Sequence, residues 1–158
     1  MGVRIGVEII FFLKAAFFGL AAIVLIPKEQ YKKFLVYGLI LGGLADILLI
    51  LVFGKIIGGV RYLNTGVFDI LKLTSFWTPI AWSFVLMYFL YSLPLKKGFF
   101  YTYIVIFGFF GYCIGIVLEH FGLYQYIGVF RYITPLIIIA WFYIAARLYM
   151  RWEKLKLQ

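Results

Sequence analysis

Five long apolar runs, separated by short polar segments, dominate the pattern of the chain. They extend over Ile5–Ile26, Phe34–Ile57, Thr74–Leu93, Phe99–Leu118 and Val129–Met150, and together they cover about two thirds of the sequence. Each run has at least the ~20 residues that an α-helix needs to cross the hydrocarbon core of a bilayer. The pattern predicts one all-α domain over residues 1–158, a polytopic transmembrane helical bundle with five crossings.

The breaks between the runs carry helix-ending residues. Pro27 ends the first run, Gly58 ends the second and Pro94 separates the third from the fourth, because proline and glycine interrupt helices. The last break, residues 119–128, is mostly amphipathic. The longest connection, residues 58–73, contains a stretch at 67–72 that we expect to form a short helix lying in the membrane interface.

Composition supports the membrane assignment. The chain is 66% hydrophobic and 13% charged, with a mean hydropathy of +1.07. A soluble domain averages about 45–50% apolar and about 25% charged residues, so a soluble globule is excluded. Glu8 and Lys14 interrupt the first run, which we therefore interpret as a retained helix rather than a cleaved signal peptide.

The positive charges indicate an orientation. The net charge is +9, but the lysines and arginines lie between the apolar runs, as expected for contacts to lipid headgroups and not for a nucleic-acid interface. With five crossings, nine of them fall on the side of the C-terminus and five on the other side. Because cytoplasmic loops are enriched in Lys and Arg, the count predicts an external N-terminus and a cytoplasmic C-terminus.

Two opposite charges fall at one depth inside the membrane. Lys14 lies sixteen residues before Gln30, where the first hairpin turns, and Asp46 lies sixteen residues after it. Residues equidistant from a hairpin turn lie at equal depth, so we expect a Lys14–Asp46 ion pair near the midplane. This pair either binds an ion, a proton or a polar group of a substrate, or it only fixes the register of the helices.

The remaining charged candidates lie near the external interface. Glu8 falls within one turn of Lys55 by the same symmetry, and Glu119 and Arg131 flank the last break, where they can pair. His120 is either a proton-responsive group or a polar cap. With a single histidine and a single cysteine, the sequence predicts no metal site, no cofactor and no catalytic residues.

Small residues recur at helical spacing. Gly38 and Gly42 precede Asp46 by eight and four residues, and Gly111 and Gly115 precede Glu119 in the same way. Residues four apart share a helix face, so these positions, with Ala15 and Gly19 on the first run, predict grooves for helix packing. Several large aromatic residues inside the runs either line a ligand cavity or form the bundle core: Trp82, Tyr88, Tyr112, Trp141 and Tyr143.

A group of positions between Gly38 and Tyr126 resembles a known family. They are Asp46, Trp77-Thr78-Pro79, Tyr91, Pro94-Leu95-Lys96, Glu119, Gly122 and Tyr124. Their order resembles an uncharacterised family of small multi-pass membrane proteins of endospore-forming Firmicutes. The resemblance implies a bacterial cytoplasmic membrane protein; it implies no activity and no catalytic residues.

Three functions follow as hypotheses. The first is a non-catalytic assembly module whose glycine grooves dock other helices, either from further copies of the chain or from a partner membrane protein. The second is a small substrate-binding or transport protein that uses Lys14 and Asp46. The third is an enzyme acting on a lipid-soluble substrate, for which no catalytic constellation is visible. Membrane lipids are the expected surroundings in each case, and nucleic acid is not an expected partner.

Overall fold

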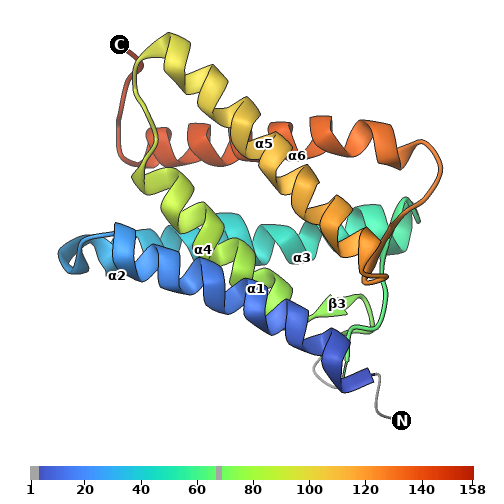
Figure 1. Ribbon diagram of the computed structural model, residues 1–158. Coiled ribbons are helices and arrows are strands. Elements are labelled where there is room, and N and C mark those ends of the chain that lie inside the picture. The colour runs from blue at the N-terminus through green and yellow to red at the C-terminus, as the bar shows by residue number, and fades with distance from the viewer. Residues whose placement is uncertain (1–3, 67–68) are drawn as a thin grey trace.

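The computed structural model describes residues 4–66 and 69–158, and this part of the chain is mostly helical (Figure 1). It contains five helical rods. The first is α1 (Arg4–Leu25), and the second runs without a break through α2 (Lys28–Gly38), the π-helix η1 (Leu39–Leu44), α3 (Ala45–Ile50) and the π-helix η2 (Leu51–Ile56). The others are α4 (Trp77–Tyr91), α5 (Lys97–His120) and α6 (Phe130–Trp152).

Three of the rods within the described residues are long and apolar enough to cross a membrane: Lys28–Ile56, Lys97–His120 and Phe130–Trp152. Apolar side chains are exposed along the rods, with 67% of Phe17 on α1, 67% of Phe99 on α5 and 66% of Leu136 on α6 accessible. Exposed apolar surface on this scale suits contact with lipid rather than with water.

The third predicted run differs from its expected boundaries. Thr74 and Ser75 form the short strand β3 (Thr74–Ser75), and the helix begins only at Trp77 and ends at Tyr91. Thr74 and Ser75 pair with β2 (Asp69–Ile70), so their backbone bonds are made to a strand and not within a helix. The resulting helix has 15 residues and a length of about 22 Å, which is short for a full crossing.

The connection before α4 also differs from expectation. Residues 67–68 lie outside the described part of the chain, and residues 69–75 form the β2–β3 hairpin instead of the expected interfacial helix. Leu71 and Lys72 adopt positive φ angles of 54° and 59° at its turn, and such angles do not fit a right-handed helix. The Lys72 backbone N–H donates to the Asp69 carboxylate at 3.3 Å.

Helix α4 lies at the centre of the bundle. Both α1 and the α2–η1 segment pack against it, while α5 packs against α6. Its residues Leu86, Met87 and Phe89 are fully buried, and the Phe89 ring lies 4.7 Å from the ring of Phe142 on α6. Because α4 is covered by its neighbours, its short apolar length is buried mainly in protein.

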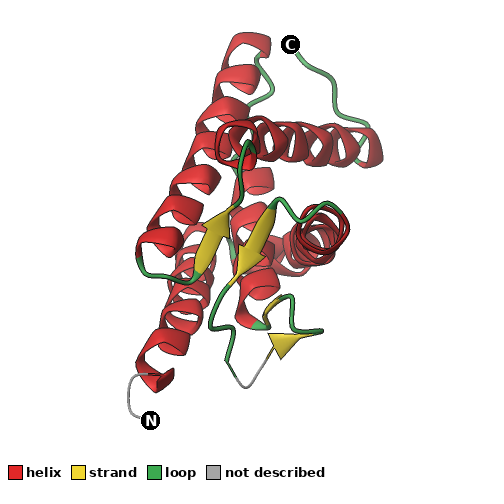
Figure 2. Cartoon of the chain, turned by 90° about the vertical axis from the view of Figure 1, so that its right-hand side faces the viewer, coloured by secondary structure: helices red, strands yellow, loops and turns green. Residues whose placement is uncertain are grey.

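The helices alternate between two ends of the molecule. The α1–α2 turn, the α4–α5 connection and the C-terminus lie at one end, on the left of Figure 1, and the strand-bearing connections lie at the other. There β1 (Val60–Tyr62) pairs antiparallel with β4 (Tyr124–Tyr126), with Tyr62 opposite Tyr124 (Figure 2). We call these the C-terminal end and the strand end.

The predicted break between α5 and α6 is present, and its geometry places β4. Gly122 has a φ of +69° and its N–H donates to the Glu119 carbonyl, while the Leu123 N–H donates to the Leu118 carbonyl at 2.8 Å. These two bonds form a Schellman motif that ends α5. The chain then turns directly into β4 and back toward the bundle.

Candidate functional site

A cavity of about 90 Å³ lies inside the strand end of the bundle. Its walls come from α1, the Lys28–Ile56 rod, α4, α5, α6 and the strands β1 and β4, and they include Lys14 and Asp46. One water needs only about 10–15 Å³ of such cavity volume. The cavity therefore has room for several waters or for a small organic molecule.

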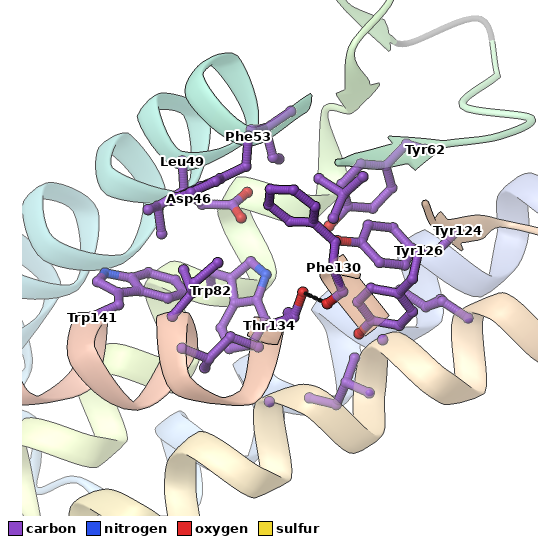
Figure 3. Close-up of a pocket in the computed structure, with 18 of the residues that line it drawn as sticks. Asp46, Leu49, Phe53, Tyr62, Trp82, Tyr124, Tyr126, Phe130, Thr134 and Trp141 are labelled. Atoms are coloured by element: carbon purple, nitrogen blue, oxygen red, sulfur yellow. Dashed lines mark hydrogen bonds between the residues drawn. The ribbon is translucent and has the colours of Figure 1, made fainter. Parts of the chain in front are cut away.

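Aromatic rings form much of the wall (Figure 3). The ring centroids of Trp82 and Trp141 are 5.1 Å apart in an edge-to-face arrangement. The rings of Tyr62 and Tyr124 are 4.8 Å apart, as are those of Tyr124 and Tyr126. Residues two apart in a strand face the same side, and the β1–β4 register adds Tyr62 to that side. The two short strands thus bring three tyrosines to one wall.

The tryptophan wall is held by an irregular helix. The Trp141 indole N–H donates to the Leu41 carbonyl at 2.9 Å, inside the π-helix η1. A π-helical turn shifts the backbone bonding register, and such turns are frequent at functional sites. The bond fixes the Trp141 ring on α6 against the rod that carries Asp46.

Asp46 is a buried carboxylate without a complete set of partners. It is only 5% exposed, and its Oδ2 atom has no hydrogen-bond donor among the described residues. Figure 3 shows its carboxylate pointing into the cavity, near the rings of Trp82 and Phe130. An ionised carboxylate in such a place carries a desolvation penalty unless another group compensates its charge.

Lys14, of opposite charge, lines the same cavity. Its Nζ atom is buried and has no hydrogen-bond acceptor within the described chain, although it lies 5.6 Å from the centroid of the Phe11 ring. An aromatic face stabilises a cation by roughly 0.5–2 kcal/mol. That contact offsets only part of the desolvation of an ammonium group.

The direct Lys14–Asp46 ion pair expected from the sequence is not formed. Among the described residues, ion pairs within 4.0 Å join Lys33 to Glu153 and Arg131 to Glu119, and no others. The physical reason is the place of α4: the two arms of the first hairpin pack against α4 rather than closely against each other. The two charges therefore face one cavity from opposite arms without touching.

The expected Glu119–Arg131 pair is present at the strand end. The Arg131 guanidinium lies 3.1 Å from the Glu119 carboxylate, whose second oxygen accepts a bond from the Tyr126 N–H at 3.4 Å. The Tyr112 hydroxyl donates to the Arg131 carbonyl at 2.8 Å. These bonds fix the last residue of β4, and with it one wall of the cavity, to α5 and α6.

The other charged candidates lie away from the cavity. Lys55 and His120 are exposed, and neither lines it. The side chain of Glu8 lies outside the described part of the structure. Among the residues that are described, no three His, Cys, Asp or Glu side chains come together as metal ligands.

The small residues pack the chain's own helices together. A Cβ at Gly38 would collide with the Ser83 carbonyl on α4, and one at Gly42 with the Trp82 carbonyl. Gly19 lies against the Phe84 ring on the same helix. The remaining small residues serve similar contacts: Gly111 abuts Ile138 and Trp82, Gly115 abuts the Tyr126 hydroxyl, and Ala15 is 3% exposed.

Of the aromatic residues singled out in the sequence, Trp82 and Trp141 line the cavity, whereas Tyr88, Tyr112 and Tyr143 do not. Three further tyrosines line the cavity and were not predicted from the sequence to do so: Tyr62, Tyr124 and Tyr126. The signal for the last two was their spacing of two residues, typical of one face of a strand.

A second hollow, of about 170 Å³, adjoins the cavity. Ile50, Val60 and Tyr62 line both, and the second hollow adds Arg61 and Lys72. Both of these basic residues are exposed. The hollow that adjoins the cavity is therefore lined by positive charge.

No protein-family model, curated protein or solved structure matches the chain. The resemblance to the Firmicutes family stays a prediction.

Proposed function

We propose that the protein is a membrane-embedded binding protein that takes a small polar molecule into the cavity between Lys14 and Asp46. Both charged groups are buried, both residues line the cavity, and neither Asp46 Oδ2 nor Lys14 Nζ has a hydrogen-bond partner among the described residues. A buried charged group without a partner is costly and is usually kept for a function. This observation carries the proposal.

The topology that we propose has five crossings, with the N-terminus outside and the C-terminus in the cytoplasm of a bacterial cell. The alternation of the five helices between two ends supports it (Figure 1), as does the excess of Lys and Arg at the C-terminal end. In this orientation the strand end, with its cavity, faces outward. The ligand would then be captured from the external side.

The glycine positions favour binding over assembly as the principal function. An assembly module needs free grooves for another helix, whereas Gly38, Gly42 and Gly111 contact helices of the same chain. A homo-oligomer or a partner membrane protein would have to use other surfaces. A separate energising partner would be needed for transport, because a complete alternating-access transporter is usually built from two repeats of several helices each.

Binding can be tested with the purified protein in lipid nanodiscs. The probes are a panel of free amino acids, small amines, carboxylates and sugars, detected by native mass spectrometry and by fluorescence of the tryptophans, two of which line the cavity. We expect at least one probe to bind, and Lys14→Met or Asp46→Asn to weaken it by about tenfold or more.

Matched controls exist for both substitutions. Lys55→Met and Asp69→Asn remove the same charges from exposed positions, and we expect both to leave binding unchanged. The proposal is wrong if no probe binds, or if the exposed variants weaken binding as much as the cavity variants do.

The topology has its own test. In a Cys113→Ser background, a single cysteine at Arg61 or at Lys154 is treated in intact cells with a membrane-impermeant maleimide. We expect Arg61→Cys to be labelled and Lys154→Cys to be labelled only after lysis. Labelling of both positions in intact cells would contradict the five-crossing orientation.

A further inference from the structure

We infer that the ligand is a small zwitterion, held with its anionic end at Lys14 and its cationic end at Asp46. This inference rests on the proposed function and names the chemical class of the ligand. Three properties of the cavity carry it: its balanced charge, its aromatic wall beside Asp46, and its limited volume.

Charge balance is the first property. The cavity presents one ammonium group and one carboxylate, separated by more than the 4.0 Å of an ion pair. The couple is neutral overall, so a simple anion or a simple cation would leave the buried site with a net charge. In a medium of low polarity an uncompensated charge is strongly disfavoured. A molecule that is neutral overall and carries two separated charges gives each group a partner and adds no net charge.

The distance between the two groups separates this site from a structural pair. Where the chain forms its other ion pairs, Lys33 with Glu153 and Arg131 with Glu119, the partners are in direct contact. The side chains of those pairs are partly exposed, so water can stabilise their charges even without an ion pair. Lys14 and Asp46, for which contact would matter most, line one cavity without forming an ion pair.

The wall beside Asp46 suits a cation. The rings of Trp82 and Trp141 lie at this part of the cavity (Figure 3), and indole faces are the best aromatic partners for ammonium groups. Trp141 is held there by its bond to the Leu41 carbonyl. A cationic group that reaches Asp46 Oδ2 would therefore meet both a carboxylate and aromatic rings.

The volume suits a ligand of about the size of a small amino acid. A cavity of about 90 Å³ holds several water-sized groups. The basic residues Arg61 and Lys72 of the adjoining hollow would attract the anionic end of the ligand. The Lys14 ammonium group at the cavity can donate hydrogen bonds to that same end.

Three probes of matched shape test the inference in nanodiscs: γ-aminobutyrate, butyrate and propylamine. The second lacks the ammonium group of the first, and the third lacks its carboxylate. We expect wild-type protein to bind γ-aminobutyrate at least about tenfold more tightly than either of the others, because each of them leaves one cavity charge uncompensated.

Substitutions should then reverse the preference. Asp46→Asn leaves the cavity with a net positive charge, so butyrate should bind more tightly than γ-aminobutyrate. Lys14→Gln leaves a net negative charge, so propylamine should be preferred. Lys55→Gln and Asp69→Asn, at exposed positions, should keep the wild-type order. The double variant Lys14→Gln/Asp46→Asn carries no cavity charge, avoids an unbalanced buried group, and should lose the preference for the zwitterion.

The outcomes separate the two proposals. If panel molecules bind in a manner that depends on Lys14 and Asp46, but butyrate or propylamine binds as tightly as γ-aminobutyrate, the zwitterion inference is overturned and the binding function stands. The same holds if the preference survives in the double variant. If nothing in the panel binds, the binding function itself fails and the inference fails with it.

Discussion

Within the described part of the chain, two lysine–carboxylate couples lie in contrasting surroundings. At the C-terminal end, the Lys33 ammonium contacts Glu153, and Tyr37 donates a second bond to the same carboxylate at 2.6 Å. At the strand end, Lys14 and Asp46 are buried and do not touch. Surface pairs contribute only about 0–1 kcal/mol. The exposed couple gains little stability from an ion pair and forms one, whereas the buried couple would gain most and forms none. This contrast indicates a role other than stability for Lys14 and Asp46.

The two couples also differ in how densely the side chains around them are packed. Beside Lys33 and Glu153 the core is closed: the Lys33 ammonium lies 5.8 Å from the centroid of the Phe34 ring, and Phe34 is only 3% exposed. Around Asp46, rings such as that of Phe130 line a cavity. The C-terminal half therefore stabilises the bundle, and the strand half holds space open.

The largest expected effect contrasts a phenylalanine of the core with one that lines the cavity. Phe142→Ala removes a fully buried ring, and we expect a loss of about 3–5 kcal/mol in the free energy of unfolding. Phe130→Ala widens a space that already exists, so its loss should be about 1 kcal/mol. Reversible unfolding in mixed micelles measures both. Equal losses would show that the cavity wall is packed as densely as the core.

The second effect concerns the buried charges. Replacing a buried ionic couple by apolar residues is often stabilising by about 1–4 kcal/mol, so Lys14→Met/Asp46→Leu should unfold at a higher temperature than wild type while losing ligand binding. Asp46→Leu alone should be less stable than the double variant, because Lys14 then lacks any compensating charge. The control Lys33→Met/Glu153→Leu removes the surface couple and should lose at most about 1 kcal/mol. Destabilisation by the cavity double variant would assign the couple a structural role.

The fold was predictable where hydropathy alone determines the elements. Runs of apolar residues that end at Pro27, Gly58 or Pro94 fix the helices to within a few residues, because few other arrangements bury them. The start of α4 was not predictable in this way. Thr74 and Ser75 continue the apolar run, and their pairing with β2 depends on a turn with positive φ at Leu71, which hydropathy does not report.

For the candidate site, the depth of the two charged residues along the helices could be predicted from the sequence, but their positions around the helix axes could not. Counting from the hairpin turn places Lys14 and Asp46 at one level, yet it gives no information about rotation around the helix axes or about a third helix. The packing of both arms against α4 decides that the charges stay apart. Tyr62 was missed because its partner Tyr124 lies far along the chain, and strands of three residues leave little periodicity to detect.

The third effect compares two glycines. Gly42→Ala places a methyl group against the backbone of α4 at Trp82, and backbone yields little, so we expect a loss of about 1–3 kcal/mol. Gly115→Ala meets only the end of the Tyr126 side chain, which can move. That variant should lose less than about 1 kcal/mol but alter ligand affinity, because Tyr126 lines the cavity. Calorimetry of unfolding and of binding, measured on both variants, separates the two effects. An unchanged affinity in Gly115→Ala would place Tyr126 outside the ligand's reach.

The smallest effect is the pH dependence of the surface couple. The hydrogen bonds from Lys33 and Tyr37 hold the pKa of Glu153 below its ordinary value of 4.5. A carboxylate whose pKa is lower in the folded protein stabilises it fully above the ordinary pKa, and this contribution disappears as the pH falls through the folded-state pKa. Wild type should therefore exceed Glu153→Gln by about 0.2–1 kcal/mol at neutral pH, with the difference shrinking once the pH drops below about 4.5. Thermal unfolding of both proteins across this range measures it, with Asp69→Asn as an exposed control. A difference that grows toward acid would mean that the folded protein favours the protonated form of Glu153. Lys33 and Glu153 would then not be a stabilising ion pair, and the contrast with the unpaired Lys14 and Asp46 would be lost.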